Sequence, residues 1–229
     1  MASCYPSIEV VTPEGVEGVY DAYATTYESD TLNKRGYMGH KNIAEMCKRH
    51  LNKEDHILVA GLDALELHAA GFHSMDGFDG SAKMLDVARE FRTTRKKIFK
   101  ATWHEMLEPD KLSKHAKSKH YDAVICVGCF APGGLDDCHV RALLEPIKPG
   151  GKLLIGVREV ALTSPPAGVL VKTTAYVVFR FPKAPYNYGL EKRLDLLEKE
   201  GKLKKLERTR FERHCDEDAG VYFAHQVLE

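Results

Sequence analysis

Short apolar runs alternate with stretches of helical periodicity through most of the chain. The runs that resemble strands are Ile57–Ala60, Ser74–Phe78, Lys97–Ala101, Asp122–Val127 and Lys152–Val157. Strand-like runs separated by helical patterns are typical of parallel sheets, in which a helix connects each strand to the next. The pattern therefore predicts an α/β fold with a doubly wound, mostly parallel sheet.

Apolar residues at helical spacing predict helices between these strands. Leu62, Leu65 and Ala69 share one face, and Gly71 ends that helix. Further helices are expected after the cap residue Ser81 (with Met84, Leu85 and Ala88 facing inward), over Leu135–Ile147 and over Leu190–Glu200.

The N-terminal region, residues 1–53, shows helical patterns and no strand-like run. One helix is expected over Val16–Tyr27, and a second carries Ile43, Cys47 and Leu51 on one face. We expect this helical cap to cover one side of the sheet.

The C-terminal region departs from the alternation of strands and helices. Two strand-like runs, Leu203–Arg213 and Val221–Leu228, are separated by little more than Cys215–Gly220. So short a link predicts an antiparallel hairpin, because a parallel crossover needs about a dozen residues or more. A seven-stranded, mostly parallel sheet that ends in an antiparallel hairpin is the arrangement of class I S-adenosylmethionine-dependent methyltransferases.

Composition narrows the class of protein further. The chain has 229 residues with 44% hydrophobic and 29% charged side chains, which suits a single globular domain over residues 1–229. Its 33 basic and 33 acidic residues balance, so no nucleic-acid partner is expected. No run of about 18 apolar residues and no secretory signal are recognisable, so we expect a cytoplasmic protein without a membrane partner.

The six cysteines are expected to be reduced thiols. Cys126 and Cys129, followed by Cys138 and His139, raise the alternative of a zinc site. A structural zinc site usually has two well-spaced ligand pairs, and Cys126 falls inside a predicted strand, so no metal is expected.

Several motifs resemble the methyltransferase-like protein 27 family of class I methyltransferases. They are VYDAYATTYESD (19–30), RGYMGH (35–40), GFHSMDGFDGSAKMLDVARE (71–90), YDAVICVGCFAPGG (121–134) and IKPGGKLLIGVRE (147–159). Their order and spacing together cover most of the chain. The resemblance implies a Rossmann-like methyltransferase that uses S-adenosyl-L-methionine and a small-molecule or protein methyl acceptor, and it leaves the oligomeric state open.

The resemblance also implies which residues bind the methyl donor. Asp79, at the end of the second strand, corresponds to the carboxylate that binds the ribose hydroxyls; turn formation is its simpler interpretation. The other implied donor-binding residues are Tyr27, Gly61, Gly80, Ser81, Met84, Thr102, Trp103, Val127 and Gly128, with Tyr37 as a weaker candidate. Packing is an equally good explanation for Tyr27 and Tyr37, and Trp103 is equally a candidate for the core. Ala101 and Thr102 stand where the family has an acid near adenine.

The first strand departs from the family. An acid directly after Ile57-Leu58 and a loop with several glycines are expected, whereas Gly61 is the only glycine before the helix and the loop is about four residues short. The missing acid would help to bind the ammonium group of the donor, and Asp63 is a partial substitute. The shortened loop predicts weakened donor binding.

A second departure lies at residues 161–184, which we interpret as an insertion. Val169–Phe181 within it is apolar and β-prone, which predicts a strand or an aggregation-prone segment. A deletion and an insertion in one chain are typical of an alternative transcript or an imperfect gene model.

Three functional hypotheses follow. The first is a methyltransferase whose general base is unknown, because His139 and Tyr27 are only two of several candidates. The second is an inactive, methyltransferase-like binding or scaffold protein. The third, a dehydrogenase that binds NAD, is disfavoured because no G-x-G-x-x-G follows the first strand.

Overall fold

The structure is a computed structural model. It describes residues 13–61, 63–94, 98–108, 111, 113–130, 134–162, 171–172, 178–179 and 189–229. Most of the predicted insertion, including the loop at 164–168, lies outside the described residues.

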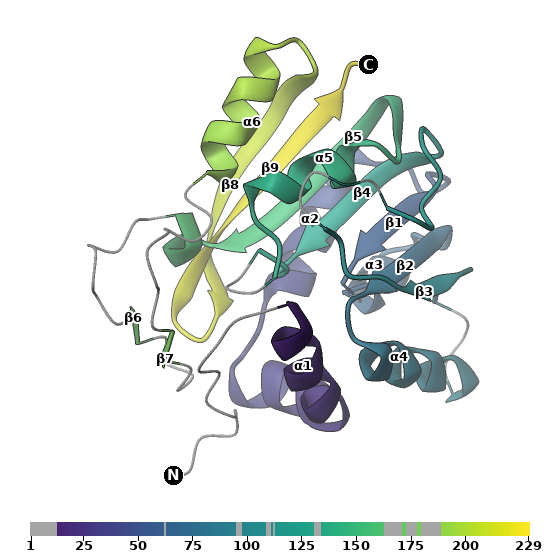
Figure 1. Ribbon diagram of the computed structural model, residues 1–229, viewed down its shortest axis with the longest axis vertical. Helices are drawn as coiled ribbons and strands as arrows, with labels where there is room; N and C mark the ends of the chain where they lie inside the picture. Colours follow the sequence, from purple (N-terminus) through teal and green to yellow (C-terminus); the bar gives the residue numbers. More distant parts are fainter. Residues whose placement is uncertain are drawn as a thin grey trace.

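A seven-stranded sheet forms the centre of the molecule, in the order β3-β2-β1-β4-β5-β9-β8 (Figure 1). Its strands are β1 (Ile57–Ala60), β2 (Met75–Asp79), β3 (Thr102–His104), β4 (Tyr121–Val127), β5 (Ile147–Arg158), β8 (Leu203–Cys215) and β9 (Asp218–Val227). The first five are parallel, whereas β9 is antiparallel to both β5 and β8. The predicted fold class, including the C-terminal hairpin, is confirmed.

The helices are α1 (Pro13–Glu28), α2 (Gly39–His50), α3 (Leu65–Ala69), α4 (Ala82–Thr94), α5 (Val140–Leu144) and α6 (Leu190–Lys199). Shorter turns are the π-helix η1 (Ser29–Lys34) and the 3-10 helices η2 (Asp137–His139) and η3 (Glu159–Leu162). Within the predicted insertion, β6 (Val171–Lys172) pairs antiparallel with β7 (Val178–Phe179).

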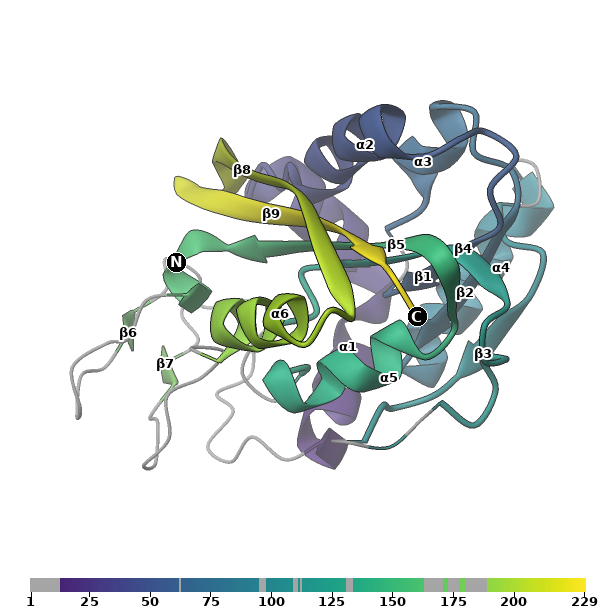
Figure 2. The same cartoon turned by 90° about the horizontal axis from the view of Figure 1, so that it is seen from above.

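Helices cover both faces of the sheet and create two hydrophobic cores. Seen from above, α2 and α3 lie on one face, and α5 and α6 lie on the other (Figure 2). Ile43 and Leu67 belong to the first core, and Leu143 and Leu194 to the second. Because the central strands are covered on both sides, consecutive residues in them are buried, and all of β1 is buried, whereas the edge strands β3 and β8 are partly exposed.

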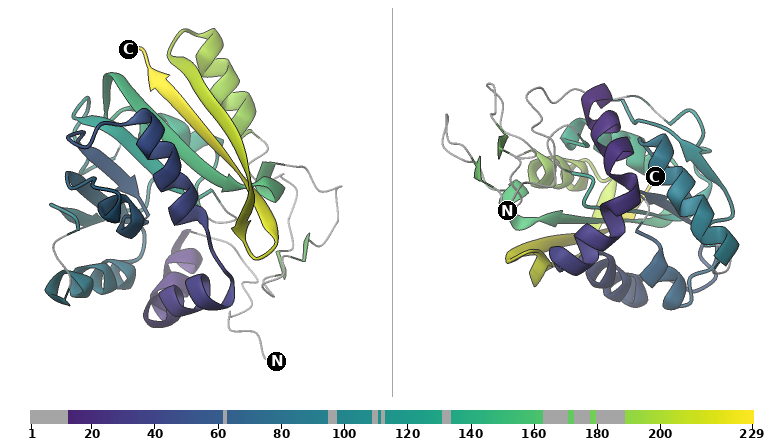
Figure 3. Two further views of the ribbon diagram at one scale, coloured as in Figure 1. Left: turned by 180° about the vertical axis from the view of Figure 1, so that it is seen from behind. Right: turned by 90° about the horizontal axis from the view of Figure 1, so that it is seen from below.

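The N-terminal helices differ in their positions. Ile43, Cys47 and Leu51 are buried on the sheet side of α2, as their spacing predicts. In contrast to the expectation that both helices cover the sheet, α1 packs against α4 beyond the ends of the parallel strands (Figure 3).

The third strand lies later in the chain than predicted. Phe99 is buried, and its ring fills the space that a side chain at Gly77 would take, since a Cβ there would lie 2.7 Å from the ring. The predicted run thus inserts its aromatic ring under β2, and the ladder begins where Thr102 pairs with Gly77.

Two predicted helices are shorter than expected. In α3 the buried positions are Ala64 and Leu67, while Leu65 is 47% exposed and Leu62 lies outside the described residues. The face predicted from Leu62, Leu65 and Ala69 is therefore wrong, because the short loop after β1 sets the start and rotation of the helix. The predicted helix over Leu135–Ile147 is reduced to η2 and α5, and Ile147 already belongs to β5.

Candidate functional site

The candidate site lies where β1, β2 and β4 end. Since these parallel strands are neighbours in the sheet, the loops after Ala60, Asp79 and Val127 meet at one edge. The chain passes from β1 to β2 on one side of β1, whereas β4 lies on the other side of β1. Ligands of open α/β sheets bind at such a switch point in strand order.

Asp79 ends β2 at this edge. Its carboxylate accepts a hydrogen bond from the backbone N–H of Ser81 at 2.8 Å. Burial raises the pKa of Asp79 to about 6, and the nearby negative charges of Asp63 and Asp21 contribute in the same direction. Among the described residues, no Lys, Arg or His lies within ion-pair distance of this half-buried carboxylate, although the charge of His104 lowers its pKa slightly, so hydroxyl donors or a cation would stabilise its charged form.

The turn after Asp79 is joined to α1. The Ser81 hydroxyl donates to Asp21 at 2.6 Å and accepts from the backbone N–H of Met84 at 3.1 Å, so it caps α4 as predicted. The Ser81 hydroxyl therefore donates one hydrogen bond and accepts another within the protein. Gly80 packs against Met106, because a Cβ at Gly80 would lie 2.7 Å from the Met106 methyl group.

Met106 was not predicted, although it borders the Asp79 turn. It lies two residues beyond the end of β3, a position that becomes recognisable only when the strand is placed at Thr102–His104. The sequence signal was the apolar Met106-Leu107 pair after the strand.

Thr102 and Trp103 lie on β3 and do not follow it, which corrects their predicted placement. The Trp103 ring stacks on Phe78 with centroids 6.1 Å apart, and its indole N–H donates to Glu105 at 3.0 Å. Trp103 is packed against the core on the α5 side, which favours its interpretation as a core residue.

Glu105 is an acid near the end of β3 that the sequence reasoning missed. It is buried, and its carboxylate accepts hydrogen bonds from Trp103, the Ser113 hydroxyl at 2.6 Å and the backbone N–H of Lys114 at 2.6 Å. These hydrogen bonds hold the loop after β3 in place, and they occupy both oxygens of the Glu105 carboxylate.

Two glycines allow close backbone approach at this edge. Gly61, just after β1, has φ +73°, and Gly128, just after β4, has φ +71°, both in the left-handed region that side chains disfavour. The backbone N–H of Gly128 donates to Gly156 at 3.0 Å, and the preceding Val127 is buried. These three residues are therefore at the predicted place.

Cys129 fills the space above the end of β1. A Cβ at Gly61 would lie 2.8 Å from its sulfur, and the thiol contacts the Ala60 carbonyl at 3.2 Å. A hydrogen bond with Cys126, together with burial, raises the pKa of the Cys129 thiol well above its ordinary value. The group is therefore a neutral, poorly nucleophilic side chain.

Tyr37 and Asp63 form a hydrogen-bonded pair beside the two glycines. The Tyr37 hydroxyl donates to the Asp63 carboxylate at 2.5 Å and lies 3.3 Å from the position of a Cβ at Gly128. Burial raises the pKa of Asp63 to about 6, although the hydrogen bond from Tyr37 opposes this. From the sequence, Tyr37 and Asp63 are only minor candidates, because nothing in their spacing predicts that the two side chains are in contact.

Tyr27 lies on the last turn of α1, where its ring contacts Tyr23 with centroids 5.4 Å apart and Tyr20 at 6.2 Å. The charge of ionised Tyr27 makes a small contribution, after burial and Asp63, to the raised pKa of Tyr37. His139, the other candidate base, is the last residue of η2, which Asp136 caps; its Nδ1 lies 2.8 Å from the Asp136 carboxylate.

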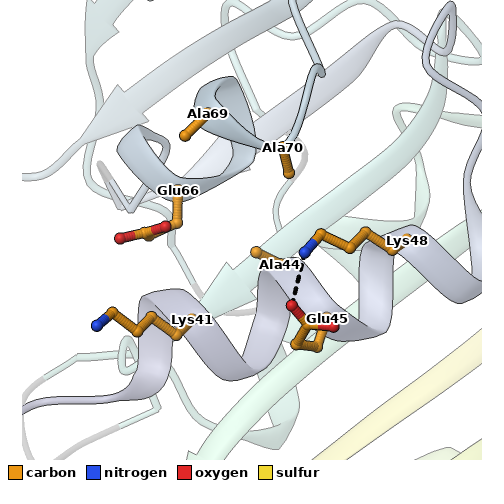
Figure 4. A pocket seen from close by; sticks show the side chains of 7 residues that line it. All are labelled: Lys41, Ala44, Glu45, Lys48, Glu66, Ala69 and Ala70. Carbon is orange, nitrogen blue, oxygen red and sulfur yellow. Dashed lines mark hydrogen bonds and ion pairs between the residues drawn. The ribbon is translucent and has the colours of Figure 1, made fainter.

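Other candidate sites lie elsewhere. Among the described residues, one group of three possible metal ligands converges, Asp136, Asp137 and Cys138, and it does not include Cys126 or Cys129. A shallow hollow of about 220 Å³ between α2 and α3 is lined by Lys41, Ala44, Glu45, Lys48, Glu66, Ala69 and Ala70 (Figure 4). Its lining residues belong to α2 and to α3 with the adjoining Ala70, and Lys48 pairs with Glu45 at 2.6 Å. No helix in the described part of the chain has the length and apolar character to cross a membrane.

The arrangement is that of known methyltransferase structures. The N-methyltransferase NodS from Bradyrhizobium japonicum WM9, in complex with S-adenosyl-L-homocysteine, has a TM-score of 0.55 at 12% identity over 83% of this chain and 86% of NodS. The CcbJ methyltransferase from Streptomyces caelestis has a TM-score of 0.55 at 17% identity over 83% of this chain and 90% of CcbJ. The [4+2]-cyclase SpnF has a TM-score of 0.65 at 13% identity over 100% of both chains.

These similarities define the fold, which is the Rossmann-like fold of class I S-adenosylmethionine-dependent methyltransferases. At such low identity they extend to the fold alone, and a cyclase shares that fold with the methyltransferases. No protein-family model and no curated protein matches the sequence.

Proposed function

We propose that this protein is an S-adenosylmethionine-dependent methyltransferase that acts on a small-molecule or protein acceptor. The observation that carries the proposal is the edge of the sheet at β1, β2 and β4. There the carboxylate of Asp79, which has no cationic partner among the described residues, lies at the same edge as two glycines in the left-handed conformation, Gly61 and Gly128. The balanced charge of the chain favours these acceptors over nucleic acid.

The residues at this edge fit the donor. In this proposal Asp79 accepts the ribose hydroxyls, and the glycines let the rest of the ligand cross from β2 toward β4. When bound, S-adenosylmethionine supplies a methyl group on a cationic sulfonium. The chain's own residues then bind and orient the reactants and exclude water, for which α1 and Tyr37 are suitably placed.

Isothermal titration with S-adenosylhomocysteine tests the proposal. We expect saturable heat with wild type and at least tenfold weaker binding for Asp79→Asn, because that change removes the charge from the ribose contact. Asp86→Asn on the exposed side of α4 is the matched control. Absence of binding by wild-type protein with a cooperative unfolding transition would contradict the proposal.

A second candidate is an inactive, methyltransferase-like binding or scaffold protein. The observation that favours it is Cys129, whose sulfur occupies the space beside Gly61 that a longer loop and a ligand would share. If the thiol obstructs the donor, Cys129→Ala should increase affinity for S-adenosylhomocysteine. Equal affinity in wild type and variant would remove the reason to prefer this candidate.

We further propose kinship with the methyltransferase-like protein 27 family within this fold. It is supported by the motifs at 35–40 and 71–90, which include Tyr37 and Asp79. A cytoplasmic location is proposed as well, and it is supported by the free thiols of Cys47, Cys126, Cys129, Cys138 and Cys215.

A further inference from the structure

Asp63 lies at the centre of the shortened loop, two residues beyond Gly61. Its carboxylate is partly buried and is held by the Tyr37 hydroxyl at 2.5 Å. Tyr37 itself is only 8% exposed, and its hydroxyl also approaches Gly128 at the end of β4. The Asp63 carboxylate is therefore fixed between the ends of β1 and β4.

Among the described residues, no cationic side chain is paired with Asp63. The ionisable groups that sense its charge are Tyr37, Asp79, Cys129 and Tyr222, all of them acids. A partly buried carboxylate without a cation is destabilising, and it is retained most readily where a ligand supplies the cation.

The order of strands in the sheet indicates in which direction a bound methyl donor would extend. If the ribose is bound at Asp79 on β2, the remainder of the donor crosses β1 toward β4 and reaches Asp63 and Gly128. That remainder is the amino-acid half, which carries an ammonium group. Tyr37 holds one oxygen of the carboxylate, and no hydrogen bond within the described residues engages the other.

We propose that Asp63, oriented by Tyr37, binds the ammonium group of the donor's amino-acid half and replaces the acid that is missing from the end of β1. This inference rests on the proposed function. Asp63 is a binding residue in this assignment, and Tyr37 is a positioning residue.

Two probes separate this inference from the proposed function. S-adenosylhomocysteine carries the ammonium group, whereas 5′-methylthioadenosine shares its adenosine half and lacks the amino-acid half. We expect Asp63→Asn to weaken S-adenosylhomocysteine binding roughly tenfold to a hundredfold, the value of one hydrogen bond between charged groups. Binding of 5′-methylthioadenosine should change by less than about twofold, because asparagine keeps the size and the acceptor for Tyr37.

The positioning role of Tyr37 is tested by a double-mutant cycle. Tyr37→Phe should weaken S-adenosylhomocysteine binding in wild type and have little further effect in Asp63→Asn, since its contribution passes through the carboxylate. Asp86→Asn is again the matched control. Folding is checked for each variant by its cooperative unfolding transition.

The outcomes are distinct. If neither probe binds folded wild-type protein, the proposed function fails. If S-adenosylhomocysteine binds and Asp63→Asn leaves its affinity unchanged, the function stands and the assignment of Asp63 is wrong. Equal losses for both probes would also overturn the assignment, because they would show a general effect on the site.

Discussion

At the scale of single residues, Asp79 and Asp63 are acids in an environment that favours their neutral forms. Burial raises the pKa of each to about 6, and each lacks a cationic partner among the described residues. Such groups destabilise the free protein at neutral pH and become favourable when a cationic ligand binds.

The first prediction concerns the pH dependence of stability. The pKa of Asp79 is about 6 when folded and about 3.9 when unfolded, so the folded state binds more protons between these values. The contribution of Asp79 to the free energy of unfolding therefore falls as pH rises from about 4 to about 6. We expect Asp79→Asn to be the more stable protein above pH 6, by roughly 1–3 kcal/mol, with a smaller difference near pH 4.5.

Urea denaturation of wild type and Asp79→Asn between pH 4.5 and 7.5 measures this difference. Asparagine retains an oxygen for the N–H of Ser81, so the turn is preserved. Asp86→Asn should show no such trend. A difference between wild type and Asp79→Asn that is constant across this pH range would contradict a raised pKa.

Residue placement was predictable only where local sequence determines it. Asp79 follows an apolar run and precedes a cap residue, so its position at the end of a strand could be inferred. The contacts of Met106 with Gly80 and of Cys129 with Gly61 join segments far apart in the sequence, so no local pattern encodes them. Those of Glu105 are local, but they depend on how the loop after β3 folds back on the strand.

At the scale of elements, α1 is attached to the candidate site by carboxylates. Asp21 accepts hydrogen bonds from the Ser81 hydroxyl at 2.6 Å and from the backbone N–H of Lys83 at 3.1 Å. Glu17 on the same helix pairs with His104 at 3.2 Å. A helix from the N-terminal region thus supplies part of the cap of α4 and is held beside the Asp79 turn.

The second prediction is that Asp21→Ala loosens α1. The change leaves the N–H of Lys83 and the Ser81 hydroxyl without this acceptor and should cost about 1 kcal/mol, the usual value of a helix cap. Hydrogen exchange of the α1 amides should become faster than in wild type. Glu28→Ala, on the exposed side of the last turn, is the control. Unchanged exchange in α1 would show that its attachment does not depend on Asp21.

The C-terminal hairpin is joined to α2 by a buried polar network. The Tyr222 hydroxyl accepts from the Asn42 amide at 3.3 Å and lies 2.6 Å from Nδ1 of His214. Burial lowers the pKa of His214 to about 3, so its ring is neutral and Nδ1 can accept the hydroxyl proton. The Asn42 amide also donates to the Arg213 carbonyl at 2.8 Å, which ties the helix to β8.

The third prediction is that Tyr222→Phe lowers the free energy of unfolding, because it disrupts the polar network between α2 and the C-terminal hairpin. The ring is retained, but the buried nitrogen of His214 and one Asn42 donor lose their partner, which should cost roughly 1–3 kcal/mol. Equilibrium urea unfolding measures the change. Phe211→Leu, at an aromatic contact of the same tyrosine, tests packing without altering the hydrogen bonds. If Tyr222→Phe is as stable as wild type, the network does not contribute.

At the scale of the whole molecule, the sheet and its order were predictable because each crossover leaves a separate local signal. The apolar runs at β1, β2 and β4 and the short link between β8 and β9 together specify parallel strands closed by a hairpin. The strand β3 and the face of α3 were misplaced, since Phe99 and Leu67 are positioned by packing and by the shortened loop. The position of α1 was not predictable, because the hydrogen bonds of Asp21 with Ser81 and Lys83 join residues 60 and 62 positions apart, which no local pattern encodes.

The last prediction is that Asp63 and Asp79 both lose protons when the donor or its product binds. Near pH 6 each is about half protonated. The ammonium group at Asp63 and the hydroxyl donors at Asp79 both favour a charged carboxylate, so S-adenosylhomocysteine binding should release protons. We expect about one proton released per ligand at pH 6 and almost none at pH 7.5, with affinity falling as pH drops through 6. Titrations in buffers with different ionisation enthalpies measure this number directly from the slope of the observed heat. In Asp63→Asn the release should fall to about half, because only Asp79 remains to ionise. Binding without any proton release at pH 6 would mean that the ligand does not contact either carboxylate in its charged form.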